Sequence, residues 1–108
     1  MLLSDKKVVM VMSSISGSIG SYKTSSGYGY RMSKAALNAS MKLASIELLS
    51  QQVKILMMHP GWVKTDMGGE NAQIEINESV KGIISVLENL DHYDTGSFID
   101  YMGKKLPW

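Results

Sequence analysis

Hydrophobic residues along the chain follow two patterns that alternate. Continuous apolar runs are typical of strands covered on both faces, and they predict strands over Lys7–Ser13, Lys54–His59 and Ser97–Ile99. Between these runs the apolar residues recur at spacings of three and four, which predicts helices over Tyr28–Ser50 and Asn77–Leu90. The predicted order is therefore strand, helix, strand, helix, strand.

This order favours parallel strands joined by right-handed helical crossovers. We expect an α/β fold that forms half of a doubly wound parallel sheet. The strand at Lys7–Met12 would lie at the edge of this half sheet and would have one uncovered side. The Ser- and Gly-rich stretch from Ser13 to Gly29 is expected to be a loop, because too little chain precedes it to form a domain.

The two predicted helices carry different patterns. In the first, an apolar stripe is formed by Met32, Ala36, Ala39, Leu43, Ile46 and Leu49. Beside it runs a more polar strip of Lys34, Asn38, Lys42 and Ser45, and a face of small side chains at Ala35, Ala36, Ala39 and Ser40. In the second helix one apolar stripe is formed by Val80, Ile83, Ile84, Leu87 and Leu90. Asn77 is expected to cap this second helix, with Glu78 in its first turn near the positive end of the dipole.

Composition narrows the classes of function. Eleven basic and ten acidic residues give a formal charge of +1, so nothing favours binding to nucleic acid or to an acidic membrane surface. The chain has no cysteine, which excludes disulfides, zinc–cysteine sites, iron–sulfur clusters and thiol nucleophiles. With two histidines we expect no metal site. No apolar run approaches the ~18 residues of a membrane span, and Met1–Lys7 lacks the order of a signal peptide, so we expect a soluble, cytoplasmic protein.

Tyr30 and Lys34 are the first candidate pair for chemistry. Residues four apart lie one above the other on a helix face. A phenol with the ordinary pKa of about 10 is a poor base at neutral pH. A lysine ammonium about 4 Å from a phenol oxygen contributes roughly 4 kcal/mol at an effective dielectric near 20, which favours the ionised phenol. Alone, the pair is also explained by chance, since many helices contain a tyrosine and a lysine at this spacing.

Two further markers follow the predicted strands. Ser14 comes directly after the first strand, and His59–Gly61 ends the second. In open α/β sheets, ligands bind at the carboxyl ends of the strands, where both markers would lie. Taken singly, Ser14 could be a turn residue that bonds its own backbone, and His59 a structural strand terminator rather than a metal ligand. Three markers at one end of one sheet favour a functional site there.

Several segments together carry a family resemblance. They are Met12–Gly20, Tyr30–Asn38, His59–Gly69, Gly96–Asp100 and Gly103–Trp108. In this order they resemble the C-terminal half of a short-chain dehydrogenase/reductase, with the C-factor-like or sniffer-like carbonyl reductases as the most similar branch. The resemblance covers nearly the whole chain. It implies the C-terminal half of a Rossmann-like sheet, within one partial domain over residues 1–108.

The resemblance also implies roles for individual residues. Ser14 corresponds to the serine that hydrogen-bonds the substrate carbonyl oxygen, with Ser13 and Ser16 as near neighbours that could replace it. Tyr30 corresponds to the general acid, or to the base in the reverse direction. Lys34 corresponds to the lysine that activates this tyrosine and holds the nicotinamide ribose. The catalytic set is therefore Ser14, Tyr30 and Lys34.

The loop after the second strand is expected to contribute to cofactor and substrate binding. Pro60 and Gly61 correspond to the turn beneath the nicotinamide, and Thr65 to the threonine that binds its carboxamide. With Val63, these residues join Tyr30 and Lys34 in the cofactor-binding set. Trp62 would line the substrate cleft together with Ser14, although packing of the indole against its own loop explains it equally well. The cofactor implied is NAD(P), with NADP(H) favoured by the resemblance.

The first function predicted is NAD(P)H-dependent reduction of a carbonyl, or oxidation of an alcohol in reverse. The family's glycine-rich phosphate turn and catalytic asparagine would lie upstream of Met1, so we expect only the catalytic half, inactive alone. The alternative is a catalytically silent product that forms a homodimer through the helix over residues 28–50. A hydrolase built on Ser14 and Lys34 is disfavoured, because neither a Ser-x-x-Lys spacing nor a nucleophile elbow is present.

Overall fold

The computed structural model describes residues 7–108. Residues 1–6, which belong to the stretch compared with a signal peptide, lie outside the described residues. Five main elements follow one another along the chain: β1 (Lys7–Met12), α1 (Tyr28–Glu47), β2 (Val53–His59), α2 (Ile76–Glu88) and β3 (Ser97–Asp100). Short 3-10 turns lie at Ile15–Gly17, Ile19–Ser21, Leu49–Gln51 and Leu90–His92. The first two of these turns are within the stretch predicted as a loop.

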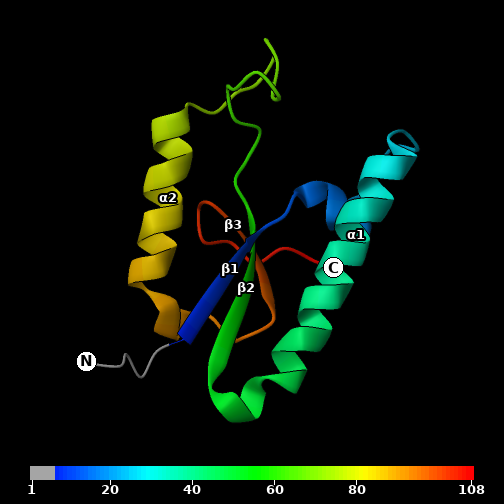
Figure 1. Ribbon diagram of the computed structural model, residues 1–108. Helices are drawn as coiled ribbons and strands as arrows, with labels where there is room; N and C mark the ends of the chain where they lie inside the picture. The colour runs from blue at the N-terminus through cyan, green and yellow to red at the C-terminus, as the bar shows by residue number, and fades with distance from the viewer. Residues whose placement is uncertain (1–6) are drawn as a thin grey trace.

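The three strands form one parallel sheet in the order β1-β2-β3. β1 pairs with β2 from Lys7 opposite Val53, and β2 pairs with β3 from Leu56 opposite Ser97. Figure 1 shows α1 and α2 on opposite sides of this sheet. The α/β fold and the alternating order predicted from the hydrophobic pattern are thereby confirmed. β1 is an edge strand, and its Val9 is 45% exposed, as predicted for an uncovered side.

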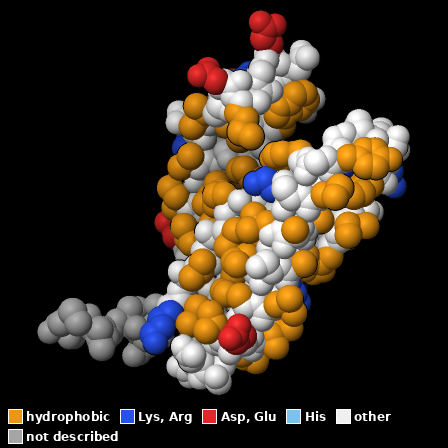
Figure 2. Space-filling view, turned by 45° about the vertical axis from the view of Figure 1, so that its right-hand side comes forward, with side chains coloured by type: hydrophobic (Ala, Val, Ile, Leu, Met, Phe, Trp, Pro, Cys, Tyr) orange, Lys and Arg blue, Asp and Glu red, His pale blue; other side chains and the backbone are white. Residues whose placement is uncertain are grey.

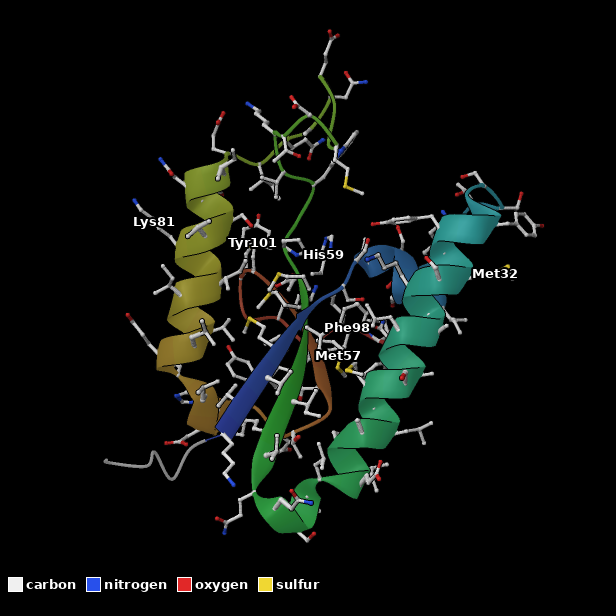
Figure 3. The ribbon with its side chains drawn as sticks, in the orientation of Figure 1. Met32, Met57, His59, Lys81, Phe98 and Tyr101 are labelled. Atoms are coloured by element: carbon white, nitrogen blue, oxygen red, sulfur yellow. The ribbon has the colours of Figure 1, made fainter. Side chains whose placement is uncertain are left out.

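Each face of the sheet has its own core, because successive side chains of a strand point to opposite faces. Toward α2, the buried cluster consists of Leu56, Met58, Val86 and Ile99. Toward α1, it consists of Ile55, Met57 and Phe98, with Met41, Ala44 and Leu48 of the helix packed against it. Figure 3 labels Met57 and Phe98 on the α1 side of the strands.

The side of α1 that faces the sheet combines polar side chains with the apolar Met41 and Ala44, and the predicted apolar stripe faces outward. The buried residues of this helix are Asn38 and Ser45, both 1% exposed and both members of the polar strip. Met32 and Leu43, of the apolar stripe, are 67% and 68% exposed. Figure 3 shows Met32 on the outer side of α1, and Figure 2 shows hydrophobic side chains gathered along this helix. Asn38 turns inward because it finds buried hydrogen-bond partners there, whereas Ser45 donates to the Lys42 carbonyl of its own helix.

Three predicted helix boundaries differ from the structure, one of them the end of α2, which is at Glu88 rather than Leu90. α1 ends at Glu47 rather than Ser50, and the chain then turns through Leu49–Gln51 to Gln52, whose φ of 59° is left-handed. This turn reverses the chain within a few residues and starts β2. α2 begins at Ile76, so Asn77 is inside the helix and is not its cap.

The cap position of α2 is occupied by Glu75, which makes no side-chain capping bond. Its carboxylate pairs with Lys64 Nζ at 2.7 Å, across the base of the preceding loop. Ser79 Oγ, in the first turn of the helix, donates to Pro60 O at 2.6 Å. The start of α2 is therefore set by contacts to the loop after β2, which local sequence does not reveal.

Neither α1 nor α2 is long and apolar enough to cross a bilayer, and residues 7–108 include no other α-helix. Within the same part of the chain, no three side chains of His, Asp or Glu lie together as metal ligands.

Candidate active site

The carboxyl ends of the three strands meet at one edge of the sheet, as parallel pairing requires. Met12 is opposite Met58, and His59 is opposite Asp100. The ladder continues one residue beyond β1, because the Ser13 N–H donates to Met58 O at 2.8 Å. The residues that follow each strand therefore emerge at this edge, with His59 at the end of β2 in Figure 3.

Ser14 begins the 3-10 turn Ile15–Gly17. Its Oγ accepts the Ser16 N–H at 3.0 Å, so its own hydroxyl hydrogen stays available to donate. The neighbouring Ser13 is 6% exposed, and its hydroxyl is bonded to Asn38 Oδ1 at 2.7 Å. Ser13 is thus part of the scaffold, whereas the half-buried Ser14 keeps a free donor, and so does the neighbouring Ser16 among the described residues.

The turn that carries Ser14 packs directly on α1. A Cβ added at Gly17 would lie 2.8 Å from Lys34 O and 2.7 Å from Asn38 Nδ2, so only glycine permits this approach. Asn38 Nδ2 also donates to Gly17 O at 3.4 Å. Asn38 therefore bonds both ends of the turn, and the turn lies against the stretch of helix that includes Lys34.

Tyr30 and Lys34 lie one helical turn apart at the same end of α1. The Lys34 ammonium is 5.5 Å from the centre of the Tyr30 ring, and Tyr30 is 45% exposed. Within residues 7–108, neither the Tyr30 hydroxyl nor the Lys34 ammonium makes a hydrogen bond to protein. These two donors are open to solvent and to a ligand.

His59 joins the ends of β2 and β1. Its Nδ1 accepts the Ile15 N–H at 3.0 Å. Burial lowers the pKa of the His59 imidazole below its ordinary value of 6.5, and the nearby Asp100 carboxylate partly raises it again. The net effect favours the neutral ring, which is the form that can accept at Nδ1.

The loop after β2 folds back on itself. Gly61 has a φ of 87°, and a Cβ there would lie 2.2 Å from Ile74 Cδ1. Val63 bridges to Ile74, and Lys64 N–H donates to Ile74 O at 2.8 Å. These contacts hold the loop closed at its base, with Pro60 and Gly61 next to the carboxyl edge.

Two predicted site residues of this loop make bonds within it. Trp62 Nε1 donates to Gly68 O at 2.6 Å, although the side chain is 50% exposed. Thr65 Oγ1 accepts the Gly68 N–H at 3.2 Å and keeps its own hydrogen available. The indole is therefore oriented by its own loop, while an exposed part of it faces outward.

The donor set fits only one end of a nicotinamide nucleotide. Free donors at Ser14, Tyr30, Lys34 and Thr65 suit a carbonyl oxygen, ribose hydroxyls and a carboxamide. Gly17 and Gly20 follow β1, but added Cβ atoms there would meet α1 and Pro107, so both glycines serve packing. Neither of these two glycines therefore belongs to a phosphate turn of the kind that binds a pyrophosphate.

Sequence reasoning misses the contacts of two residues that organise this edge. Asn38 is predicted as part of a polar strip and of a family motif, and its spacing of four from Lys34 places it on the same helix face, but its bonds to Ser13 and Gly17 are not predicted. His59 is predicted as a structural residue at the carboxyl edge, but its bond to the Ile15 N–H is not.

Comparison with known proteins agrees with this geometry. The sequence model of the family described as Enoyl-(Acyl carrier protein) reductase matches residues 1–102. C-signal of Myxococcus xanthus is 40% identical over 92 residues, which cover 85% of this chain and 55% of that protein. The structure of Carbonyl reductase Sniffer of D. melanogaster superimposes with a TM-score of 0.89 at 40% identity, covering 94% of this chain and 41% of that one.

A third relative is the NADPH bound carbonyl reductase from chicken fatty liver. Its structure gives a TM-score of 0.86 at 34% identity and covers 96% of this chain and 45% of that one. The chain belongs to the short-chain dehydrogenase/reductase family, which is a family of oxidoreductases. It matches the part of the family's Rossmann-like fold that contains the last strands of the sheet, and it spans about half the length of the curated relatives.

Proposed function

We propose that this chain is the catalytic half of an NADP(H)-dependent carbonyl reductase, with Ser14, Tyr30 and Lys34 as its catalytic residues. The observation that carries the proposal is the contact between the Ser14 turn and the Lys34 segment of α1, which Gly17 makes possible. This contact places the serine turn on the helix that also carries Tyr30. Among the structures similar to this chain, the fly and the chicken proteins are both described as carbonyl reductases, and the chicken one is NADPH bound.

In this mechanism each of the three residues acts on the substrate carbonyl or on the group that protonates it. Ser14 donates its free hydroxyl hydrogen to the substrate carbonyl oxygen and polarises the carbonyl. Tyr30 transfers its hydroxyl proton to that oxygen, and Lys34 stabilises the phenolate that remains. When bound, the nicotinamide supplies the hydride that adds to the carbonyl carbon. The product is an alcohol, and the phenolate regains a proton from solvent.

The cofactor would be held at its nicotinamide end by this chain. Lys34 and Tyr30 would bond the ribose, and Thr65 the carboxamide, with Pro60, Gly61 and Val63 forming the adjacent wall. The adenosine half has no counterpart among residues 7–108. The chain by itself is therefore expected to bind NADPH weakly and to reduce no carbonyl at a useful rate, since positioning supplies roughly 7–11 kcal/mol of such a barrier.

The test supplies the other half from a relative. Residues 7–108 replace the matching segment of the chicken carbonyl reductase, and reduction of a reactive dicarbonyl is followed by NADPH absorbance. We expect activity that falls about 10²–10⁴-fold with Tyr30→Phe and also falls with Lys34→Ala. The control is Lys81→Ala, on the opposite helix, which is expected to leave the rate unchanged. A chimera that binds NADPH but is inactive, or is equally active with Tyr30→Phe, would contradict the proposal.

Self-association through α1 is a second function that one observation favours. Ile46 and Leu49 continue the exposed stripe begun by Met32 and Leu43, and they are 63% and 61% exposed. A groove of about 390 Å³ opens beside this stripe, between α1 and Trp108. A row of large apolar side chains exposed along one helix is typical of a protein–protein interface.

Light scattering at increasing concentration tests this second function. We expect a dimer that Leu43→Glu converts to a monomer, whereas Val80→Glu on the exposed side of α2 leaves the dimer intact. A chain that stays monomeric at every concentration would exclude it.

A further inference from the structure

His59 is the side chain that connects the end of β2 to the turn after β1. Its Nδ1 accepts the N–H of Ile15, a residue 44 positions earlier in the chain, at 3.0 Å. Ile15 directly follows Ser14, whose Oγ accepts the Ser16 N–H at 3.0 Å. The peptide between Ser14 and Ile15 is thus fixed on both sides.

The turn has two anchors of different chemistry. From α1, Asn38 bonds Ser13 Oγ at 2.7 Å and Gly17 O at 3.4 Å, and an amide does not titrate. From β2, His59 bonds the middle of the turn through a nitrogen that accepts only when the ring is neutral. One anchor is therefore permanent, and the other depends on protonation.

We propose that His59 is a positioning residue for Ser14: its Nδ1 holds the turn Ser14–Gly17 at the carboxyl end of β2, and protonation of the ring releases that turn. The proposal rests on the proposed function only for the catalytic role of Ser14. The hydrogen bond and its dependence on the ring's charge stand apart from reductase activity.

The surroundings of the ring are consistent with a neutral histidine. Its burial lowers the pKa, and Asp100 on the neighbouring strand is the charged group that opposes this effect. Asp100 Oδ1 accepts the N–H groups of Met102 and Lys104, both at 2.9 Å, so this carboxylate serves the turn after β3. The Tyr101 ring lies against Gly61, two residues after His59, and Figure 3 shows Tyr101 and His59 at the same end of the sheet.

The test uses nuclear magnetic resonance of the isotope-labelled 108-residue chain, titrated from about pH 8 to about pH 5. The His59 ring is expected to titrate with a midpoint below 6.5. The Ile15 amide resonance should move with the same midpoint, and the Ser14 and Ser16 resonances should move with it. An Ile15 resonance that ignores the His59 titration would overturn the proposal without any variant.

Two substitutions separate the acceptor from the titration. His59→Asn keeps an acceptor close to the position of Nδ1 but cannot be protonated, so the Ile15 amide should keep its neutral-pH position across the range. His59→Leu removes the acceptor, and exchange of the Ile15 amide hydrogen should become about fivefold faster at neutral pH. His92→Asn, at the other histidine, is the matched control and should change neither readout.

Each outcome decides the proposal. Rescue by His59→Asn together with the loss in His59→Leu supports it, and equal behaviour of the two variants refutes it. If the carbonyl reductase chimera proves inactive while the Ile15 amide still follows His59, the proposed function fails and the positioning contact remains. If the chimera is active, its reduction rate should fall at acid pH, and the His59→Asn chimera should not show this fall. An unchanged fall in the variant would show that His59 does not position Ser14.

Discussion

The two faces of the sheet are held by different forces. Toward α2, Leu56, Met58 and Ile99 pack against aliphatic side chains of the helix, with Val86 at the centre. Toward α1, an apolar cluster around Phe98 lies beside buried hydrogen bonds that join Asn38 to the turn after β1. The first face resembles the core of an ordinary domain. The second combines an apolar core with the hydrogen bonds of Asn38.

This difference follows from what each helix has to position. An apolar contact is non-directional, so most of α2 covers the sheet without fixing a single position, apart from the Ser79 bond to Pro60 at its start. Hydrogen bonds require defined distances and angles, so the bonds of Asn38 fix where the Ser14 turn lies on α1. The candidate active site is on the face that uses directional bonds.

The largest loss in the free energy of unfolding is expected from a substitution on the α2 face. Leu56→Ala removes a side chain that is completely buried, and we expect a loss of about 2–5 kcal/mol in the free energy of unfolding. Urea denaturation followed by circular dichroism measures it. The Ser14 and Ile15 resonances should stay at their wild-type positions in the variant that remains folded, because the cavity lies on the other face. A shift of these resonances would show that the two faces are coupled.

A smaller loss in the free energy of unfolding is expected when the hydrogen bonds of Asn38 on the α1 face are removed. Asn38→Ala leaves the Ser13 hydroxyl and the Gly17 carbonyl without their partner, which costs about 1–3 kcal/mol. Adding Ser13→Ala should recover part of that loss, since it removes one of the orphaned groups. Denaturation of both variants gives the coupling, and strictly additive losses would mean that the Ser13–Asn38 bond contributes nothing.

The close approach of the turn to α1 can be broken without removing a hydrogen-bonding group. Gly17→Ala places a Cβ within 3 Å of the Lys34 carbonyl, so the turn must move, at about 1–3 kcal/mol. Gly29→Ala is the matched control, because no atom lies within 4 Å of its added Cβ and alanine favours the helix by about 0.5–1 kcal/mol. Unfolding curves should therefore shift in opposite directions for the two variants. Two shifts in the same direction would contradict the packing argument.

The smallest change in stability is expected when the pH is lowered and His59 becomes protonated. The pKa of His59 is lower in the folded chain than its ordinary value of 6.5, so the unfolded chain binds the proton more readily. The stability that this residue contributes is complete above about pH 6.5 and is lost as the pH falls through the folded-state pKa. The urea midpoint of the wild type should fall more between about pH 7.5 and pH 5 than that of His59→Asn. Equal falls would show that other groups cause the acid sensitivity.

Much of the architecture was already present in the sequence. The alternation of apolar runs with helical spacings predicted three parallel strands and two crossovers, because each pattern depends on neighbours only a few residues away. The spacing of Tyr30 and Lys34 placed both on one helix face, and Ser14 was correctly placed after the first strand. The family motifs extended this to the assignment of the chain to the short-chain dehydrogenase/reductases.

Other features were decided only by the tertiary structure. The inward turn of Asn38 depends on Ser13, 25 residues away, and the role of His59 depends on Ile15, 44 residues away. The start of α2 at Ile76 depends on contacts between Pro60 and Ser79 and between Lys64 and Glu75. A polar side chain is stable inside a protein only where a partner meets it, and local sequence does not tell where the chain returns. For that reason the hydrophobic pattern predicted the elements of this protein, whereas the face of α1 that is buried and the anchors of the Ser14 turn emerged only from the packed fold.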